Sequence, residues 1–202
     1  MPTQTRSQDR QSAIVTEPAA ALPVSLSDAK AHLVVEGEAD NRQILEFIKG
    51  ANDFVQLYTG RTLITQTYKY GMQGWPDVIE LPHPPVSEIV EITYIDSAGD
   101  TQILAADQYI LDQFCPYGKI YPAYGVSWPD LRDERNNIVV EYKAGYGDTS
   151  AAIPGDIKSA LKLIIGEAYN NREITLVGVG VAAIEMPFGI YALLDRYRIM
   201  SV

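Results

Sequence analysis

Two glycines ahead of a periodic helix raise the question of phosphate binding. Residues 140–173, VEYKAGYGDTSAAIPGDIKSALKLIIGEAYNNRE, run from a strand-like segment through Gly145 and Gly147 into that helix. Glycine-rich loops placed between a strand and a helix cradle phosphates with backbone amides. However, neither G-x-x-x-x-G-K-[ST] nor G-x-G-x-x-G is present, and Asp148 and Asp156 would repel a phosphate. We therefore interpret this loop as a connection between two parts of the chain.

Nucleophilic or metal chemistry would have to use the single cysteine and the two histidines. Cys115 with His83 as its base would make a hydrolase, but the QFCPYGK context of Cys115 is neither a helix start nor a nucleophile elbow. His32, His83 and Cys115 also lack the spacing of metal ligands. We expect no catalytic residue, no metal and no cofactor, and keep the hydrolase only as a weaker alternative.

Aromatic residues in the middle of the chain offer a different kind of site. Trp75 and Trp128 each precede a proline, and three tyrosines lie near Trp128. Platforms for single-stranded nucleic acid interleave such aromatics with cations, but Lys119 is the only cation nearby. Packing or a protein interface fits this pattern better. A small ligand- or glycan-binding β module with helical flanks remains the alternative function.

The charge distribution disfavours a surface that grips nucleic acid. The net charge of the 202 residues is −10, and residues 51–150 carry six Lys/Arg against fourteen Asp/Glu. Binding to a phosphate backbone depends on clustered cations. An acidic wall beside a passage for DNA is compatible with this charge, and so is a simple role in solubility.

Targeting signals are weak. The first residues lack the apolar core of a signal peptide, and a lone cysteine allows no internal disulfide, so we expect a cytosolic site of folding. Residues 174–194 have one charge in 21 residues, a length that would just span a bilayer. Because Glu185, Pro187 and three glycines interrupt this run, we interpret it as a loop followed by a helix, and expect no membrane contact.

Periodicity predicts an α+β fold. Apolar residues at helical spacing indicate a small bundle of helices near 25–34, 40–59, 156–173 and 187–199, with Ser25 or Ser27 and Asp40 as N-caps and Gly60 as a C-cap. Between the second and third helices, β-branched and aromatic runs separated by turn residues predict an antiparallel β insertion of short strands. We expect a flexible arm at 1–22, a helical core from 23–60 and 151–202, and a β-rich insertion at 61–150.

The order of five motifs resembles a known family. The motifs are PVSLSDAKAHL, YTGRTLITQT, ELPHPPVSEIVEITYIDSAG, VEYKAGYGD followed by IPGDIKSALKLIIGEAYNNRE, and EMPFGIYALLDRYR. Together they resemble the head–tail connector (adaptor) proteins of tailed phages, in the long form with a β insertion. Related gene-transfer particles carry similar proteins. The resemblance covers residues 22–198, which is nearly the whole chain after the N-terminal arm.

The resemblance implies a structural virion protein and not an enzyme. Subunits of such connectors form a ring on the portal protein, extend the DNA channel, and present a platform for head completion or tail attachment. The implied partners are the portal protein, further copies of the chain, and the next head-completion or tail protein. DNA would pass through the channel without sequence-specific binding. The implied location is the head–tail interface of a virion assembled in the host cytoplasm.

Two groups of residues are candidate contacts in that setting. In connectors the C-terminal segment commonly docks into the portal, and arginine and tyrosine are frequent in interface hot spots. The portal-docking candidates are therefore Arg196, Tyr197, Arg198, Ile199 and Met200. The broad apolar arc of the second helix and the apolar segment after the third supply subunit-interface candidates, which are Phe47, Phe54, Leu176, Val177 and Val179.

Overall fold

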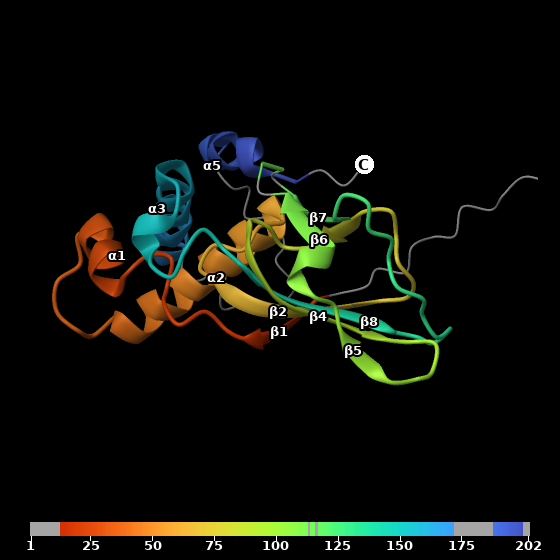
Figure 1. The fold of residues 1–202 in the computed structure, drawn as a ribbon. Helices are drawn as coiled ribbons and strands as arrows, with labels where there is room; N and C mark the ends of the chain where they lie inside the picture. The colour runs from red at the N-terminus through yellow and green to blue at the C-terminus, as the bar shows by residue number, and fades with distance from the viewer. Residues whose placement is uncertain (1–12, 113, 116, 172–187, 200–202) are drawn as a thin grey trace, which may run out of the picture. The chain divides into compact units, whose positions relative to one another are not determined.

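The computed structural model describes residues 13–112, 114–115, 117–171 and 188–199. They belong to two compact units, each discontinuous in sequence. A helical unit contains Ala19–Thr65 and Gly145–Val202, and a β-rich unit contains Met1–Pro18 and Gln66–Ala144. Helices and antiparallel sheets are thus segregated, which is the α+β architecture that the sequence predicts (Figure 1).

The helical unit is built from α1 (Leu26–Leu33), α2 (Asn41–Thr59), α3 (Gly155–Asn170) and α5 (Phe188–Leu194). The Oγ of Ser25 accepts from the backbone N–H of Asp28 at 3.1 Å and caps α1. Gly60 ends α2 at φ 70°, where a left-handed residue is needed. Asp40 precedes α2 but gives it no side-chain cap, because its carboxylate accepts a 2.6 Å hydrogen bond from Tyr169 of α3.

The core of this unit lies between α1, α2, α3 and α5 (Figure 1). Helices α2 and α3 contact each other, and α1 and α5 each contact both of them. Every residue of the stripe that predicted α3 from Ile157 to Ile165 is buried, since its spacing places it on one side of the helix. The fully or nearly buried members are Val24, Ala29, Ile44, Ile48, Ala51, Val55, Leu63, Ile64, Ile153, Ile157, Ala160, Leu161, Ile164, Ile165, Ile190 and Leu194.

The last predicted helix is shorter than 187–199. The α-helix ends at Leu194, residues Asp195–Tyr197 make one 3₁₀ turn, η3, and Arg198 is extended. This extended backbone directs the amide of Ile199 to the carbonyl oxygen of Thr59 at 2.9 Å. A contact with the end of α2 therefore takes the place of another helical turn.

The β-rich unit holds two antiparallel sheets. The larger has the strand order β1-β2-β8-β4-β5, and the smaller has the order β3-β7-β6. The strands are β1 (Ile14–Glu17), β2 (Gln66–Met72), β3 (Ile79–Leu81), β4 (Val86–Ile95), β5 (Thr101–Ile103), β6 (Tyr109–Asp112), β7 (Gly118–Pro122) and β8 (Ile138–Ala144). The predicted insertion of short antiparallel strands is present as β2 to β8, and a turn in which the Asp96 amide donates to the Asp100 carbonyl joins β4 to β5.

Strand β1 differs from the predicted flexible arm at 1–22 for residues 14–17, while residues 1–12 of that prediction lie outside the described residues. Ile14 pairs with Lys69 and Glu17 pairs with Thr67 of β2, so residues 14–17 form an edge strand. The carboxylate of Glu17 also accepts a 2.9 Å hydrogen bond from the buried Thr67 hydroxyl. Cross-strand bonds hold this segment, although all four of its side chains are exposed and leave no apolar pattern.

The glycine loop has a structural explanation. A Cβ on Gly145 would lie 2.5 Å from the backbone nitrogen of Thr65, a distance that real Cβ atoms do not show. The N–H of Tyr146 donates to Leu63 at 3.0 Å, and the N–H of Thr65 donates to Gly147 at 3.1 Å. Glycine allows the two strands of chain at residues 63–65 and 145–147 to approach this closely. The loop therefore serves as a connection between two parts of the chain, as the lack of a phosphate-binding motif in its sequence indicates.

Candidate functional site

The C-terminal segment is bound by side chains of its own helical unit. Arg196 forms a 2.8 Å ion pair with Asp156 at the start of α3, and the Tyr197 hydroxyl donates to the same carboxylate at 3.4 Å. The Tyr58 hydroxyl of α2 donates to Asp195. This hydrogen bond to a carboxylate, followed by desolvation, raises the pKa of Tyr58. Residues 195–197 are thus held from two helices.

Backbone atoms of the same segment are also engaged. The guanidinium Nε of Arg61 donates to the carbonyl oxygen of Tyr197 at 2.6 Å, and the Ile199 amide donates to Thr59. The Arg198 guanidinium lies 5.2 Å from the ring centroid of Tyr58, a cation–π distance. The candidate docking residues 196–199 therefore lie together, but folded back on their own chain. Met200 is outside the described residues.

One face of α2 presents apolar side chains outward. Phe47 and Phe54 are partly buried and pack against the helical core, while Leu57, one turn beyond Phe54, is 86% exposed. The ring of Phe54 stacks on Tyr58 with centroids 6.1 Å apart. The sequence prediction missed Leu57, although its i+3 spacing from Phe54 was a usable signal. The other interface candidates, Leu176, Val177 and Val179, lie outside the described residues.

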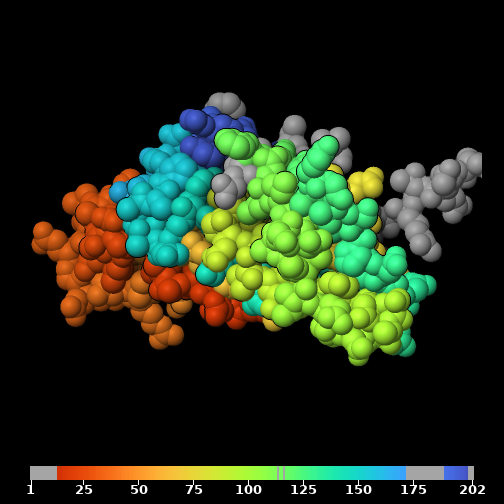
Figure 2. All heavy atoms as spheres, in the orientation of Figure 1, coloured from red at the N-terminus to blue at the C-terminus, as the bar shows by residue number. Residues whose placement is uncertain are grey.

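The hairpin of β6 and β7 carries a second set of exposed apolar residues. Ile110 of β6 pairs with Tyr121 of β7, and these side chains are 54% and 36% exposed. Phe114 and Tyr124 lie close in sequence and are fully exposed. Residues of this region (green) reach the surface in Figure 2. Such a concentration of exposed apolar area is typical of a protein-contact surface.

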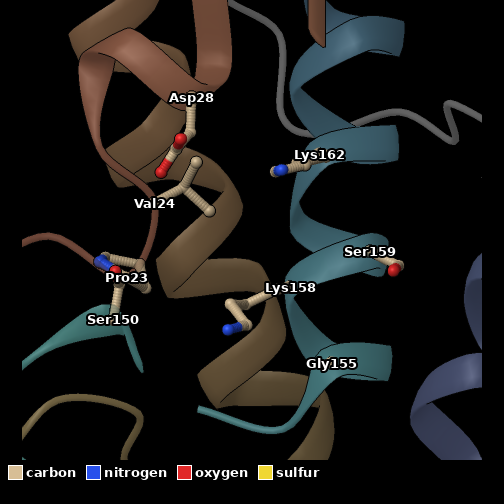
Figure 3. A pocket seen from close by; sticks show the side chains of 8 residues that line it. All are labelled: Pro23, Val24, Asp28, Ser150, Gly155, Lys158, Ser159 and Lys162. Carbon is tan, nitrogen blue, oxygen red and sulfur yellow. The ribbon is translucent and has the colours of Figure 1, made fainter. Parts of the chain in front are cut away.

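A polar cavity of about 280 Å³ opens in the helical unit between the start of α1 and the first turns of α3. Lys158 and Lys162 of α3 extend toward the side formed by Pro23, Val24 and Asp28 (Figure 3). We call this cavity the lysine pocket, and its lining is Pro23, Val24, Asp28, Ser150, Gly155, Lys158, Ser159 and Lys162. A concave site with two ammonium groups is suited to an anionic side chain.

The two tryptophans fasten loops of the β-rich unit to each other. Their rings stack with centroids 4.6 Å apart and 10° between planes. The indole N–H of Trp75 donates to Pro129 at 2.9 Å, and that of Trp128 donates to Pro76 at 3.0 Å. Both N–H groups are therefore used within the chain instead of being offered to a ligand.

His83 and Cys115, the residues of the alternative hydrolase site, each make local contacts within the β-rich unit. His83 stacks on Tyr68 with centroids 5.3 Å apart, and burial lowers the pKa of its imidazole. Cys115 lies after β6, where the carboxylate of Asp112 accepts from its backbone N–H at 3.2 Å. No hydrogen bond joins His83 to Cys115 in the described part of the chain. Within that same part, no three His, Cys, Asp or Glu side chains gather as a metal site.

None of the helices among the described residues is both long enough and apolar enough to cross a bilayer. Most of the apolar run at 174–194 lies outside these residues.

Comparisons with known proteins agree on one group. The chain resembles a chain in the "Virion of native gene transfer agent (GTA) particle" with 24% identity and a TM-score of 0.74, covering 94% of this chain and 96% of that chain. It resembles a chain in the "Neck of native GTA particle computed with C12 symmetry" with 26% identity and a TM-score of 0.71, covering 95% and 96%.

A further likeness is to the "Neck of empty GTA particle computed with C6 symmetry", at 22% identity and a TM-score of 0.70, covering 94% and 97%. A search of curated protein sequences gave no significant match. The family model described as "Head completion protein" matches residues 24–200, a range that covers most of both structural units. The chain belongs to the head completion protein family.

Proposed function

We propose that this chain is a head–tail connector subunit that assembles as a ring on the portal protein. The single observation that carries the proposal is the end-to-end likeness to a chain in the neck of a gene transfer agent particle, at 26% identity over 95% of this chain. That neck is described with twelvefold symmetry. The likeness extends over 95% of this chain and 96% of that chain, which favours the same role.

A ring requires two different complementary faces on each subunit, because each heterologous contact joins one face of a subunit to the other face of its neighbour. The apolar face of α2 with Phe47, Phe54 and Leu57 is our proposal for one face. Leu176, Val177 and Val179, which lie outside the described residues, remain interface candidates from the sequence. The exposed hairpin of β6 and β7 is available for the next head-completion or tail protein.

The C-terminal segment is our proposal for the element that docks on the portal. Arg196, Tyr197, Arg198, Ile199 and Met200 end the chain with hot-spot residue types next to apolar ones. Their contacts with Asp156, Arg61 and Thr59 must open, at least in part, when they dock. Docking is therefore coupled to release of this segment.

The acidic charge fits a passage for DNA. Seven Lys/Arg against fourteen Asp/Glu give the β-rich unit a net charge of −7. Such a surface repels phosphate and lets a duplex slide past without a sequence-specific contact. The role is structural, and we assign it no catalytic step and no cofactor.

The alternative of a ligand- or glycan-binding module has less support. Its candidate platform is the pair Trp75 and Trp128, whose indole N–H groups already donate to backbone carbonyls. Sugar recognition combines stacking with hydrogen bonds, and this pair supplies only stacking.

The test is a pull-down with assembled portal protein from the same particle. Full-length chain should be retained, and chain ending at Leu194 should be lost. Because truncation removes intrachain contacts, a second variant with Arg196→Ala and Arg198→Ala keeps the chain length. Arg42→Ala, which removes an exposed arginine of α2, is the matched control and should bind like wild type. Equal retention of all variants would remove the docking role of the segment, and no retention of wild type would contradict the connector function.

A further inference from the structure

We propose that the lysine pocket receives carboxylate side chains from the β-rich unit of a second copy of this chain. The inference rests on the ring assembly proposed above and specifies one of its contacts. It concerns a surface distinct from the apolar face of α2 and from the C-terminal segment.

Two lysine side chains of the lysine pocket have no charged partner among the described residues. Lys158 and Lys162 lie one turn apart on α3, and neither makes an ion pair or hydrogen bond with any residue that the structure describes. Asp28 is the one acidic residue of the lining, so the pocket carries a net charge of +1. Two lysines without a partner among the described residues therefore line one cavity, in a chain whose net charge is −10.

The size and the walls of the lysine pocket suit carboxylate side chains. A cavity of about 280 Å³, walled by Pro23 and Val24 opposite α3, has room for one or two carboxylate side chains (Figure 3). The hydroxyls of Ser150 and Ser159 can donate to a carboxylate oxygen beside the ammonium groups. Duplex DNA presents its phosphates on a broad convex surface, which fits a concave pocket of this size less well.

The positive charge of the lysine pocket is complementary to exposed carboxylates of the β-rich unit. The β-rich unit has a net charge of −7, against −3 for the helical unit with its nine Lys/Arg and twelve Asp/Glu. Asp77, Asp100 and Asp130 of the β-rich unit are exposed and have no side-chain partner among the described residues. Pocket and carboxylates lie on different units, so a contact between copies is heterologous, as ring closure requires.

Zero-length cross-linking tests the contact. A carbodiimide joins a lysine amine to a carboxylate only when the two touch. An equal mixture of ¹⁵N-labelled and unlabelled chain is cross-linked on assembled portal and, separately, at high concentration without portal. The expected product joins a peptide containing Lys158 or Lys162 to an acidic peptide of residues 66–144, with labelled and unlabelled partners mixed. Links only within one copy, links only to portal peptides, or absence of links at both lysines would overturn the proposal.

Charge reversal supplies the second measurement. Lys158→Glu and Lys162→Glu should each weaken association between copies about tenfold, with a smaller difference at high salt. Lys49→Glu is the matched control, because it reverses an exposed lysine of α2 outside the pocket and should leave association unchanged. Equal association of all three variants would overturn the proposal. The proposal would also be overturned if Lys158→Glu and Lys162→Glu changed only the binding of added duplex DNA and not the association between copies.

The two proposals fail in distinguishable ways. If wild-type chain does not bind portal but gives the inter-copy cross-links in concentrated solution, the pocket contact stands and the connector function fails. If wild type and Lys158→Glu bind portal and fill the ring equally, the connector function stands and the pocket contact fails.

Discussion

Arg61→Ala should release the C-terminal segment from the helical unit. Arg61 holds the carbonyl oxygen of Tyr197 at 2.6 Å, in a partly buried position between α2 and the segment. The remaining links are the Ile199 amide bond to Thr59, the Tyr58 hydroxyl bond to Asp195, the cation–π contact of Arg198 with Tyr58, and the contacts of Arg196 and Tyr197 with Asp156. In the Arg196–Asp156 pair the side chains are 68% and 41% exposed. An exposed pair of this kind contributes at most about 1 kcal/mol.

The magnitude follows from these contacts. A hydrogen bond from a charged donor contributes roughly 1.5–3 kcal/mol, which partial exposure of Arg61 reduces to about 1–2 kcal/mol. Ordering of each backbone residue costs about 1–2 kcal/mol, so the docked segment has little surplus stability. Loss of Arg61 should therefore lower the ratio of docked to released segment by about 5- to 30-fold.

Amide hydrogen exchange at Ile199 is the assay. In wild type the Ile199 amide should exchange slowly, because it donates to Thr59, and in Arg61→Ala its exchange should accelerate by the factor above. Amides in the middle of α3 should keep their protection, and Arg42→Ala is the control for loss of an arginine. Unchanged exchange at Ile199 in Arg61→Ala, or unprotected Ile199 in wild type, would refute the reasoning. If the segment docks on the portal, Arg61→Ala should also bind the portal more tightly by up to the same factor.

Three further changes test other parts of the structure. Val34→Gly should raise the free energy of unfolding by about 0.5–1 kcal/mol, because Val34 is 89% exposed and its φ of 56° is strained for a β-branched residue. An unchanged or lower melting temperature would contradict this. Trp75→Ala should destabilise the β-rich unit by about 2–3 kcal/mol in chemical denaturation, because Trp128 loses its stacking partner; a loss below about 0.5 kcal/mol would mean that the stack does not hold the loops. Because burial lowers the pKa of His83 in the folded state, the unfolded chain takes up the proton first, and the free energy of unfolding should decrease as the pH falls below about 6.5. His83→Asn should flatten that part of the pH profile, and asparagine tolerates the φ of 59° at this position. An identical pH profile for wild type and His83→Asn would show that another group causes the decrease.

Much of the fold was predictable because its signals are local. The stripe from Ile157 to Ile165 repeats at helical spacing, and Gly60 and Ser25 are caps whose chemistry is written in one or two residues. The strands of the insertion combine β-branched residues with frequent turn signals, so an antiparallel insertion of short strands could be predicted. A β-rich insertion interrupting a helical core also follows from this order of patterns.

The features that were not predicted depend on pairing between distant residues. Strand β1 has no buried side chain, and only its bonds to β2, about 50 residues later, make it a strand. The fold-back of Tyr197 and Ile199 joins residues about 140 positions from their partners near the end of α2, and no local pattern encodes it. The lysine pocket likewise exists only when the start of α1 lies against α3.

The most direct test of the connector function is electron microscopy of assembled portal protein incubated with this chain. The account predicts a ring of additional density on one end of the portal, with the helical unit of each subunit fitting that density and the C-terminal segment contacting the portal. Portal particles without added density, under conditions where the chain is folded and in excess, would contradict it.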